Sequence, residues 1–101
     1  MISQELKDIA HHYGYEAQSN QLIEECAELI QAINKYRRAV LCKGQPTAGS
    51  IKAVALDNIT EEIADVEVMI EQIKYLLQIS DEDIEAVKIY KENRTRGRMG
   101  N

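Results

Sequence analysis

Five acidic residues with a repeated spacing of three are the part of this sequence best suited to chemistry. Glu24, Glu25 and Glu28 form the pattern Glu-Glu-x-x-Glu, and Glu62 and Asp65 form a later Glu-x-x-Asp. Residues three apart on a helix project toward the same side, about 60° apart. Glu-rich helices are often plain solvated surface, so the first pattern alone is a weak signal. Two such pairs on facing helices, however, would make a cage of oxygen ligands suited to Mg²⁺ or Mn²⁺ and not to Zn²⁺.

The position of Glu62 strengthens the prediction of a metal site. At about 100° per residue, the apolar side chains of a helix over 58–79 fill one arc, with Glu62 inside it and Asp65 at its edge. A carboxylate on an apolar face is costly unless something compensates its charge. Lys74 is the only basic residue of this helix after Glu62, and it lies on another side. Shared cations are therefore expected to balance these carboxylates and those of the preceding helix.

Turn signals divide the chain into four predicted helices that would position these groups. The expected ranges are 3–13, 18–42, 58–79 and 81–95, with a loop over 43–50. Gly14 separates the first two helices, and the segment 51–57 fits either a loop or a helix. Asn58 with Glu61 resembles a capping box, and the acidic run after Ser80 is typical of a helix start. We expect one all-α domain over residues 1–101, a four-helix bundle with a frayed tail at 97–101.

Composition argues against several classes of protein. The chain has 101 residues, 45% hydrophobic and 29% charged, which is enough for one packed domain. The absence of Trp and Phe argues against a β-sandwich or β-barrel. No apolar run could cross a membrane and the start lacks a secretory signal, so we expect a soluble cytoplasmic protein. Cys26 and Cys42 provide neither a disulfide framework nor a CxxC metal site.

The net charge of −5 is unevenly distributed along the chain. Five basic residues and one glutamate give residues 88–101 a charge of +4, which leaves −9 for the rest. Such a basic end is typical of a nucleic-acid-binding tail, of a group that pairs with anions inside one site, or of a solvated helix end. Charge alone does not choose among these three.

The motifs and their order resemble those of the MazG-like all-α nucleotide pyrophosphohydrolases. Three segments carry the resemblance, which extends over about residues 4–98: Gln18–Leu29, Glu61–Val66 and Lys91–Arg96. It implies an enzyme that requires Mg²⁺, or Mn²⁺ as a substitute, and cleaves the α–β phosphoanhydride of nucleoside triphosphates. The products would be nucleoside monophosphate and pyrophosphate. The chain departs from the family in a longer gap between the two acidic motifs, in its lack of Trp for base stacking, and in Gln21, where a Lys is common.

The resemblance also implies roles for individual residues. The metal ligands would be Glu25, Glu28, Glu62 and Asp65. Glu24 would help to hold a metal or the attacking water. Phosphate or sugar oxygens would be contacted by Lys91, Asn93 and Arg96. Without Trp, recognition of the base would fall to tyrosines or to amides such as Gln18.

The sequence also predicts that copies of this chain assemble with one another. On the helix predicted at 58–79, a second apolar strip predicts an interface between copies, and the resemblance likewise implies a homo-dimer or homo-tetramer. The strip consists of Ala64, Val68, Tyr75 and Ile79.

One alternative function is a non-catalytic helical module for oligomerisation or nucleic-acid binding. The other is phosphoribosyl-ATP pyrophosphohydrolase, a relative with the same acidic motifs. Under the main hypothesis the partner is a nucleoside triphosphate, and neither a membrane nor a nucleic acid is expected.

Overall fold

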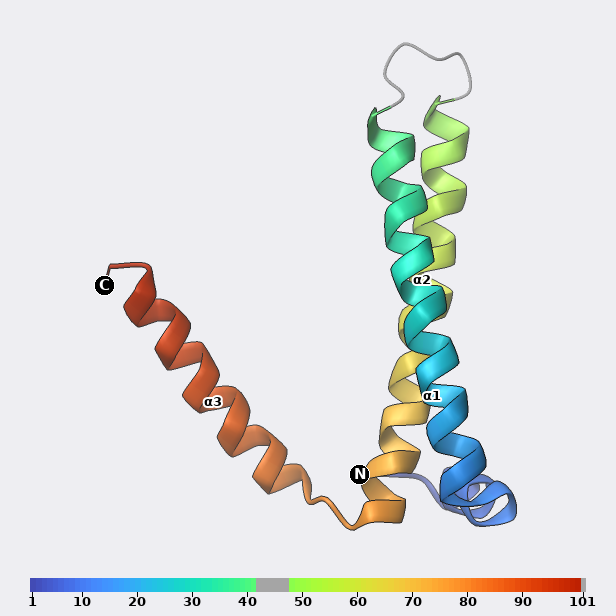
Figure 1. Cartoon of the computed structure of the whole chain (residues 1–101), viewed down its shortest axis with the longest axis vertical. Helices are drawn as coiled ribbons and strands as arrows, with labels where there is room; N and C mark the ends of the chain where they lie inside the picture. The colour runs from blue at the N-terminus through green and yellow to red at the C-terminus, as the bar shows by residue number, and fades with distance from the viewer. Residues whose placement is uncertain (42–47, 101) are drawn as a thin grey trace.

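The computed structural model describes residues 1–41 and 48–100, without the side chains of Ala48 and Ser50. These residues form three helices and no strand: α1 (Gln4–Leu41), α2 (Ala48–Leu77) and α3 (Asp81–Arg98). In Figure 1, α1 and α2 lie side by side as a long antiparallel hairpin, while α3 points away from it. The all-α class is confirmed, but within the described residues a single chain makes a two-helix hairpin with a separate third helix and no four-helix bundle.

The first two predicted helices are parts of α1. They meet at Gly14, whose backbone is non-helical, with φ of 84° and ψ of 169°. Glycine adopts a positive φ without the steric cost that a Cβ would impose, so the chain bends sharply here and the helix resumes at once. The predicted break is therefore present as a kink of one residue.

The predicted start of the next helix at Asn58 is wrong. α2 begins at Ala48, so Asn58 lies inside a helix and 51–57 is helical. Ala55, which is only 5% exposed, packs in the α1–α2 interface, and this tertiary contact favours helix where local pattern was ambiguous. Of the predicted loop at 43–50, residues 43–47 lie outside the described residues and 48–50 belong to α2.

The predicted start of α3 is confirmed by its cap. The Oγ atom of Ser80 accepts a hydrogen bond from the backbone N–H of Asp83 at 3.0 Å. The helix continues to Arg98, beyond the predicted end at 95 and into the tail that was expected to fray. No residue of α3 is buried, and all of its side chains but the half-buried Ile84 are exposed.

Small side chains form the core between α1 and α2. The buried apolar residues are Ala10, Ala32, Ala39, Ala55, Val66 and Met69. Alanine lets two helix backbones approach closely, which explains how the pair stays in contact over its full length. Among the described residues, no helix combines the length and apolar character that crossing a membrane requires.

Candidate metal centre

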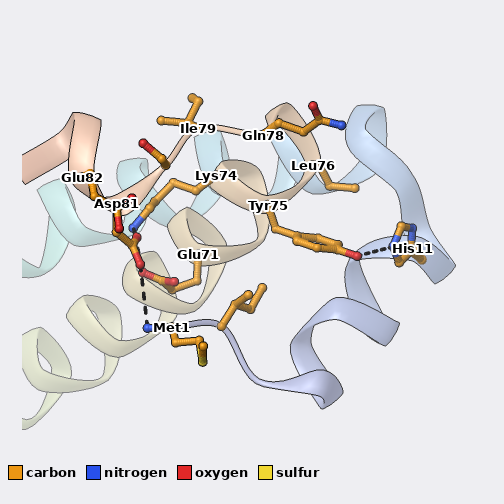
Figure 2. Close-up of a pocket in the computed structure, with 12 residues that line it drawn as sticks. Met1, His11, Glu71, Lys74, Tyr75, Leu76, Gln78, Ile79, Asp81 and Glu82 are labelled. Atoms are coloured by element: carbon orange, nitrogen blue, oxygen red, sulfur yellow. Dashed lines mark hydrogen bonds and ion pairs between the residues drawn. The ribbon is translucent and has the colours of Figure 1, made fainter.

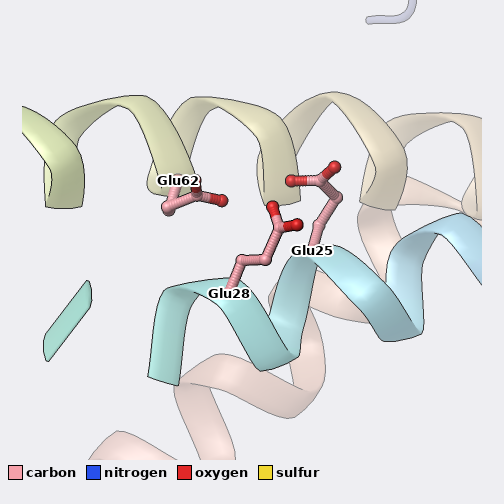
Figure 3. Close-up of side chains that lie close together, drawn as sticks. All are labelled: Glu25, Glu28 and Glu62. Atoms are coloured by element: carbon pink, nitrogen blue, oxygen red, sulfur yellow. The ribbon is translucent and has the colours of Figure 1, made fainter. Parts of the chain in front are cut away.

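Three carboxylates from the two long helices converge halfway along the hairpin. Glu25 and Glu28 lie one turn apart on α1 and point toward Glu62 on α2 (Figure 3). Each residue offers one carboxylate oxygen, and these three oxygens lie within 4.8 Å of one another. The spacing of three places both α1 carboxylates on one side of the helix, and the antiparallel packing brings the third to them.

Two oxygens of this cluster are buried without a hydrogen-bond partner. They are Oε2 of Glu25 and Oε2 of Glu62. The other oxygen of Glu25, Oε1, accepts a hydrogen bond from Nε2 of Gln21 at 2.7 Å. A buried acceptor without a partner costs free energy, and a charged one costs more. These oxygens therefore need a proton or a cation.

The electrostatic environment is unfavourable to negative charge at Glu62 and Asp65. Desolvation raises the pKa of Glu62 above its ordinary value of 4.5, and repulsion from Glu28, Asp65 and Glu25 raises it further. Desolvation followed by repulsion from Glu25 likewise raises the pKa of Asp65 above 3.8. Both shifts have the sign expected for like charges held together without a counter-ion.

Basic side chains do not neutralise the cluster within the described ranges 1–41 and 48–100. The ion pairs there join Lys74 to Glu71 and Asp81, and the N-terminal amine to Asp81, at the other end of α2. Three hard oxygen donors with two unpartnered atoms fit a divalent cation such as Mg²⁺ or Mn²⁺, which would keep further positions for water or phosphate oxygens. The same donor set lacks the His or Cys ligands of most zinc sites.

The remaining acidic residues of the prediction lie beside the three-carboxylate cluster. Asp65 is exposed and lies one turn from Glu62, close enough to Glu25 for their charges to interact. Glu24 is also exposed and lies next to Glu25 in sequence, outside the group of converging oxygens. Both positions are open to solvent, so each carboxylate can reach water at the edge of the cluster.

Gln18 lies in the core of the hairpin. It is 7% exposed, and its Nε2 atom donates a hydrogen bond to Oε1 of Gln72 at 2.7 Å. Gln72 itself is only 2% exposed. This pair links α1 to α2, and the side chain of Gln18 has almost no surface facing solvent.

The three α3 residues predicted to contact the substrate lie far from the carboxylates within one chain. Lys91, Asn93 and Arg96 are exposed on α3, which does not pack on the hairpin (Figure 1). A single copy of the described chain therefore separates the acidic and basic halves of the predicted site.

Two further polar residues, Lys35 and Asn58, lie beside the cluster, although the sequence predicted no role at the site for either. Beside the cluster is a cavity of about 350 Å³, lined by Glu28, Gln31, Ala32, Lys35, Asn58 and Glu62. The signal was present in the sequence, because Lys35 follows Glu28 by seven residues and Asn58 precedes Glu62 by four. Both spacings keep residues on one face of a helix.

A second cavity, of about 500 Å³, lies where the N-terminal segment meets the end of α2 (Figure 2). His11 and the hydroxyl of Tyr75 are hydrogen-bonded across it at 2.7 Å, and Lys74 binds Asp81 at its rim. These contacts anchor the start of α1 and the start of α3 to α2. We assign this cavity a structural role.

Comparison with known proteins finds no matching family model, no matching curated protein and no matching solved structure.

Proposed function

We propose that this protein is a Mg²⁺-dependent nucleoside triphosphate pyrophosphohydrolase of the MazG-like type, with Mn²⁺ as a substitute metal. It would cleave the α–β phosphoanhydride in the cytoplasm and release a nucleoside monophosphate and pyrophosphate. The observation that carries the proposal is the convergence of Glu25, Glu28 and Glu62, two of which have buried oxygens without partners. The order of acidic and basic motifs along the chain supports it as well.

Each acidic residue has a distinct role in this proposal. Glu25, Glu28 and Glu62 would bind the metal, and Asp65, exposed one turn from Glu62, would be a further ligand. A bound divalent cation would polarise the phosphoryl group and offset repulsion between carboxylates and phosphates. Glu24, exposed next to Glu25, would help to hold a metal or the water that attacks in line as pyrophosphate leaves.

Assembly of two or four copies is the second part of the proposal. Val68 of the hairpin is 43% exposed and Ile79, just after α2, is 40% exposed; Val87 and Tyr90 of α3 are 52% and 64% exposed. Contiguous exposed apolar surface is typical of an interface. Tyr75, the remaining large residue of the predicted strip, is partly covered by His11, so the N-terminal segment shortens the strip without closing it.

Charge complementarity supports the same assembly. Lys91 and Arg96 of α3 form no ion pair within the described residues, and no basic side chain there pairs with the three-carboxylate cluster. In a homo-dimer or homo-tetramer, α3 of one copy would bring Lys91, Asn93 and Arg96 near the carboxylates of another. These groups would then contact phosphate or sugar oxygens as charge-assisted donors.

The direct test incubates the protein with Mg²⁺ and a panel of nucleoside triphosphates and identifies the phosphate product. Pyrophosphate with nucleoside monophosphate is the expected result, and Glu62→Gln should abolish it. Orthophosphate with nucleoside diphosphate would contradict α–β cleavage. Hydrolysis of phosphoribosyl-ATP alone would instead favour that relative. Salt-sensitive binding to duplex DNA without any hydrolysis would favour the non-catalytic module.

A further inference from the structure

We infer that the groove beyond the carboxylates binds the pyrophosphate part of the substrate, through Lys35 of α1 and Asn58 of α2. The inference rests on the proposed function, because it places the phosphates next to the metal ligands. It differs from the assignment of Lys91, Asn93 and Arg96 in one respect: it requires residues of the hairpin alone.

The groove is a pair of adjoining cavities. The first, of about 350 Å³, starts at Glu28 and Glu62 and reaches Lys35 and Asn58. The adjoining cavity of the groove, of about 290 Å³, is also lined by Lys35 and Asn58 and continues past Arg38. Lys35 and Asn58 therefore lie where the two cavities meet. The carboxylates of the cluster are on one side of them, and the basic residue Arg38 is on the other.

Helix geometry explains why the charge changes sign along this groove. Lys35 lies two turns after Glu28 on α1, and Asn58 lies about one turn before Glu62 on α2. Because the helices are antiparallel, both steps lead toward the same end of the hairpin (Figure 1). A chain of phosphates bound at the carboxylates through a divalent cation would therefore extend toward donors and away from further acids.

The groove residues are suited to phosphate and are available for it. Lys35 is exposed and takes part in none of the ion pairs within the described residues, which are formed by Lys74 and the N-terminal amine. Asn58 is half-buried at the groove wall, where its amide can donate to a bound oxygen. An ammonium and an amide bind the non-bridging oxygens of a phosphate without discriminating between bases.

Calorimetry with Mn²⁺ and inorganic pyrophosphate as probes tests the inference without turnover. Mn²⁺ is titrated alone, and pyrophosphate is then titrated in saturating Mn²⁺. The test variants are Lys35→Gln and Asn58→Ala. Lys52→Gln is the matched control, because Lys52 is an exposed lysine of α2 outside the groove and its loss changes the net charge equally. Circular dichroism checks that each variant is helical.

Lys35→Gln should weaken pyrophosphate binding by about tenfold, as expected for one lost charge-assisted hydrogen bond. Asn58→Ala should weaken it by a smaller factor, about threefold to fivefold. Mn²⁺ alone should bind Lys35→Gln no more weakly than wild type, because a nearby positive charge has been removed. Lys52→Gln should leave both affinities within about twofold of wild type.

Four results would overturn the inference. Equal pyrophosphate affinity in wild type and Lys35→Gln would show that the groove does not hold phosphate. Equal weakening by Lys35→Gln and Lys52→Gln would show only a general effect of charge. Failure of a wild type that binds Mn²⁺ to bind pyrophosphate would overturn the groove site and leave the metal centre standing. Failure to bind Mn²⁺ at all would instead remove the proposed function and this inference together.

Discussion

Replacing Gln18 by Met separates a structural role for this residue from a role in substrate binding. Gln18→Met keeps the length of the side chain and removes the donor to Oε1 of Gln72, which lies 2.7 Å away. Because Gln72 is 2% exposed, its carbonyl oxygen would then be buried without a strong partner. Such a loss costs about 1–3 kcal/mol. For a chain of this size, the melting temperature should fall by about 5–20 °C.

The double variant makes the reasoning quantitative. Gln72→Met alone should destabilise by a similar amount, because it leaves the buried amide of Gln18 without its acceptor. Gln18→Met combined with Gln72→Met should recover most of the loss, since both polar groups are then replaced by apolar ones. The sum of the two single costs should therefore exceed the cost of the double variant by at least about 1 kcal/mol.

Thermal or urea unfolding at fixed protein concentration measures this cycle. Asn34→Met, at an exposed amide of α1 outside the groove, is the control and should change stability by less than about 0.5 kcal/mol. A Gln18→Met variant as stable as wild type, but with weakened nucleotide binding, would refute the buried-pair argument. It would also support the role in substrate binding that the resemblance implies for Gln18.

Three further predictions concern the metal centre and the assembly. Mg²⁺ at about 100 times its dissociation constant should stabilise the wild type by about 2.7 kcal/mol and the Glu62→Gln variant by far less. If Mg²⁺ raised the melting temperature of both proteins equally, Glu62 would be excluded as a ligand. Without metal, the raised pKa values of Glu62 and Asp65 mean that the folded state binds protons more readily than the unfolded chain, so unfolding free energy should increase as pH falls from 7 toward about 5. The pKa of Asp81 is lowered, so its contribution to the unfolding free energy is lost only as pH falls below the ordinary value of 3.8. An unfolding free energy that does not change with pH above 5 would therefore contradict the link between folding and proton binding at Glu62 and Asp65. Val68→Glu should dissociate the proposed oligomer, and light scattering of wild type at micromolar concentration should give a mass of at least twice 11.5 kDa.

Helical periodicity was sufficient to predict the part of the site formed by neighbouring turns. Glu25 and Glu28 lie on one side of α1 because a spacing of three fixes this, whatever surrounds the helix. Glu62 stood out because it interrupts an apolar arc, and the structure places it against the other two. The cap at Ser80 could also be predicted, since it depends on a hydrogen bond spanning three residues.

Other features depended on contacts between distant parts of the chain. α2 begins at Ala48 because packing against α1 stabilises turns that local pattern left ambiguous. Gln18 has a polar side chain typical of a surface, yet its partner is 54 positions away on another helix, a distance over which sequence periodicity carries no information. The groove at Lys35 and Asn58 likewise arises only when two antiparallel helices are placed in register.

The sequence by itself determined the helical class, the carboxylates that share a helix face and the uneven charge, because each follows from residue type and from spacings within a few turns. Only the tertiary structure decided which faces meet. It joined Glu62 to the α1 carboxylates, buried Gln18, and left α3 with its basic residues apart from the hairpin. The physical reason is that helix formation is governed locally, whereas helix pairing depends on the apolar area and polar partners that two distant segments offer each other.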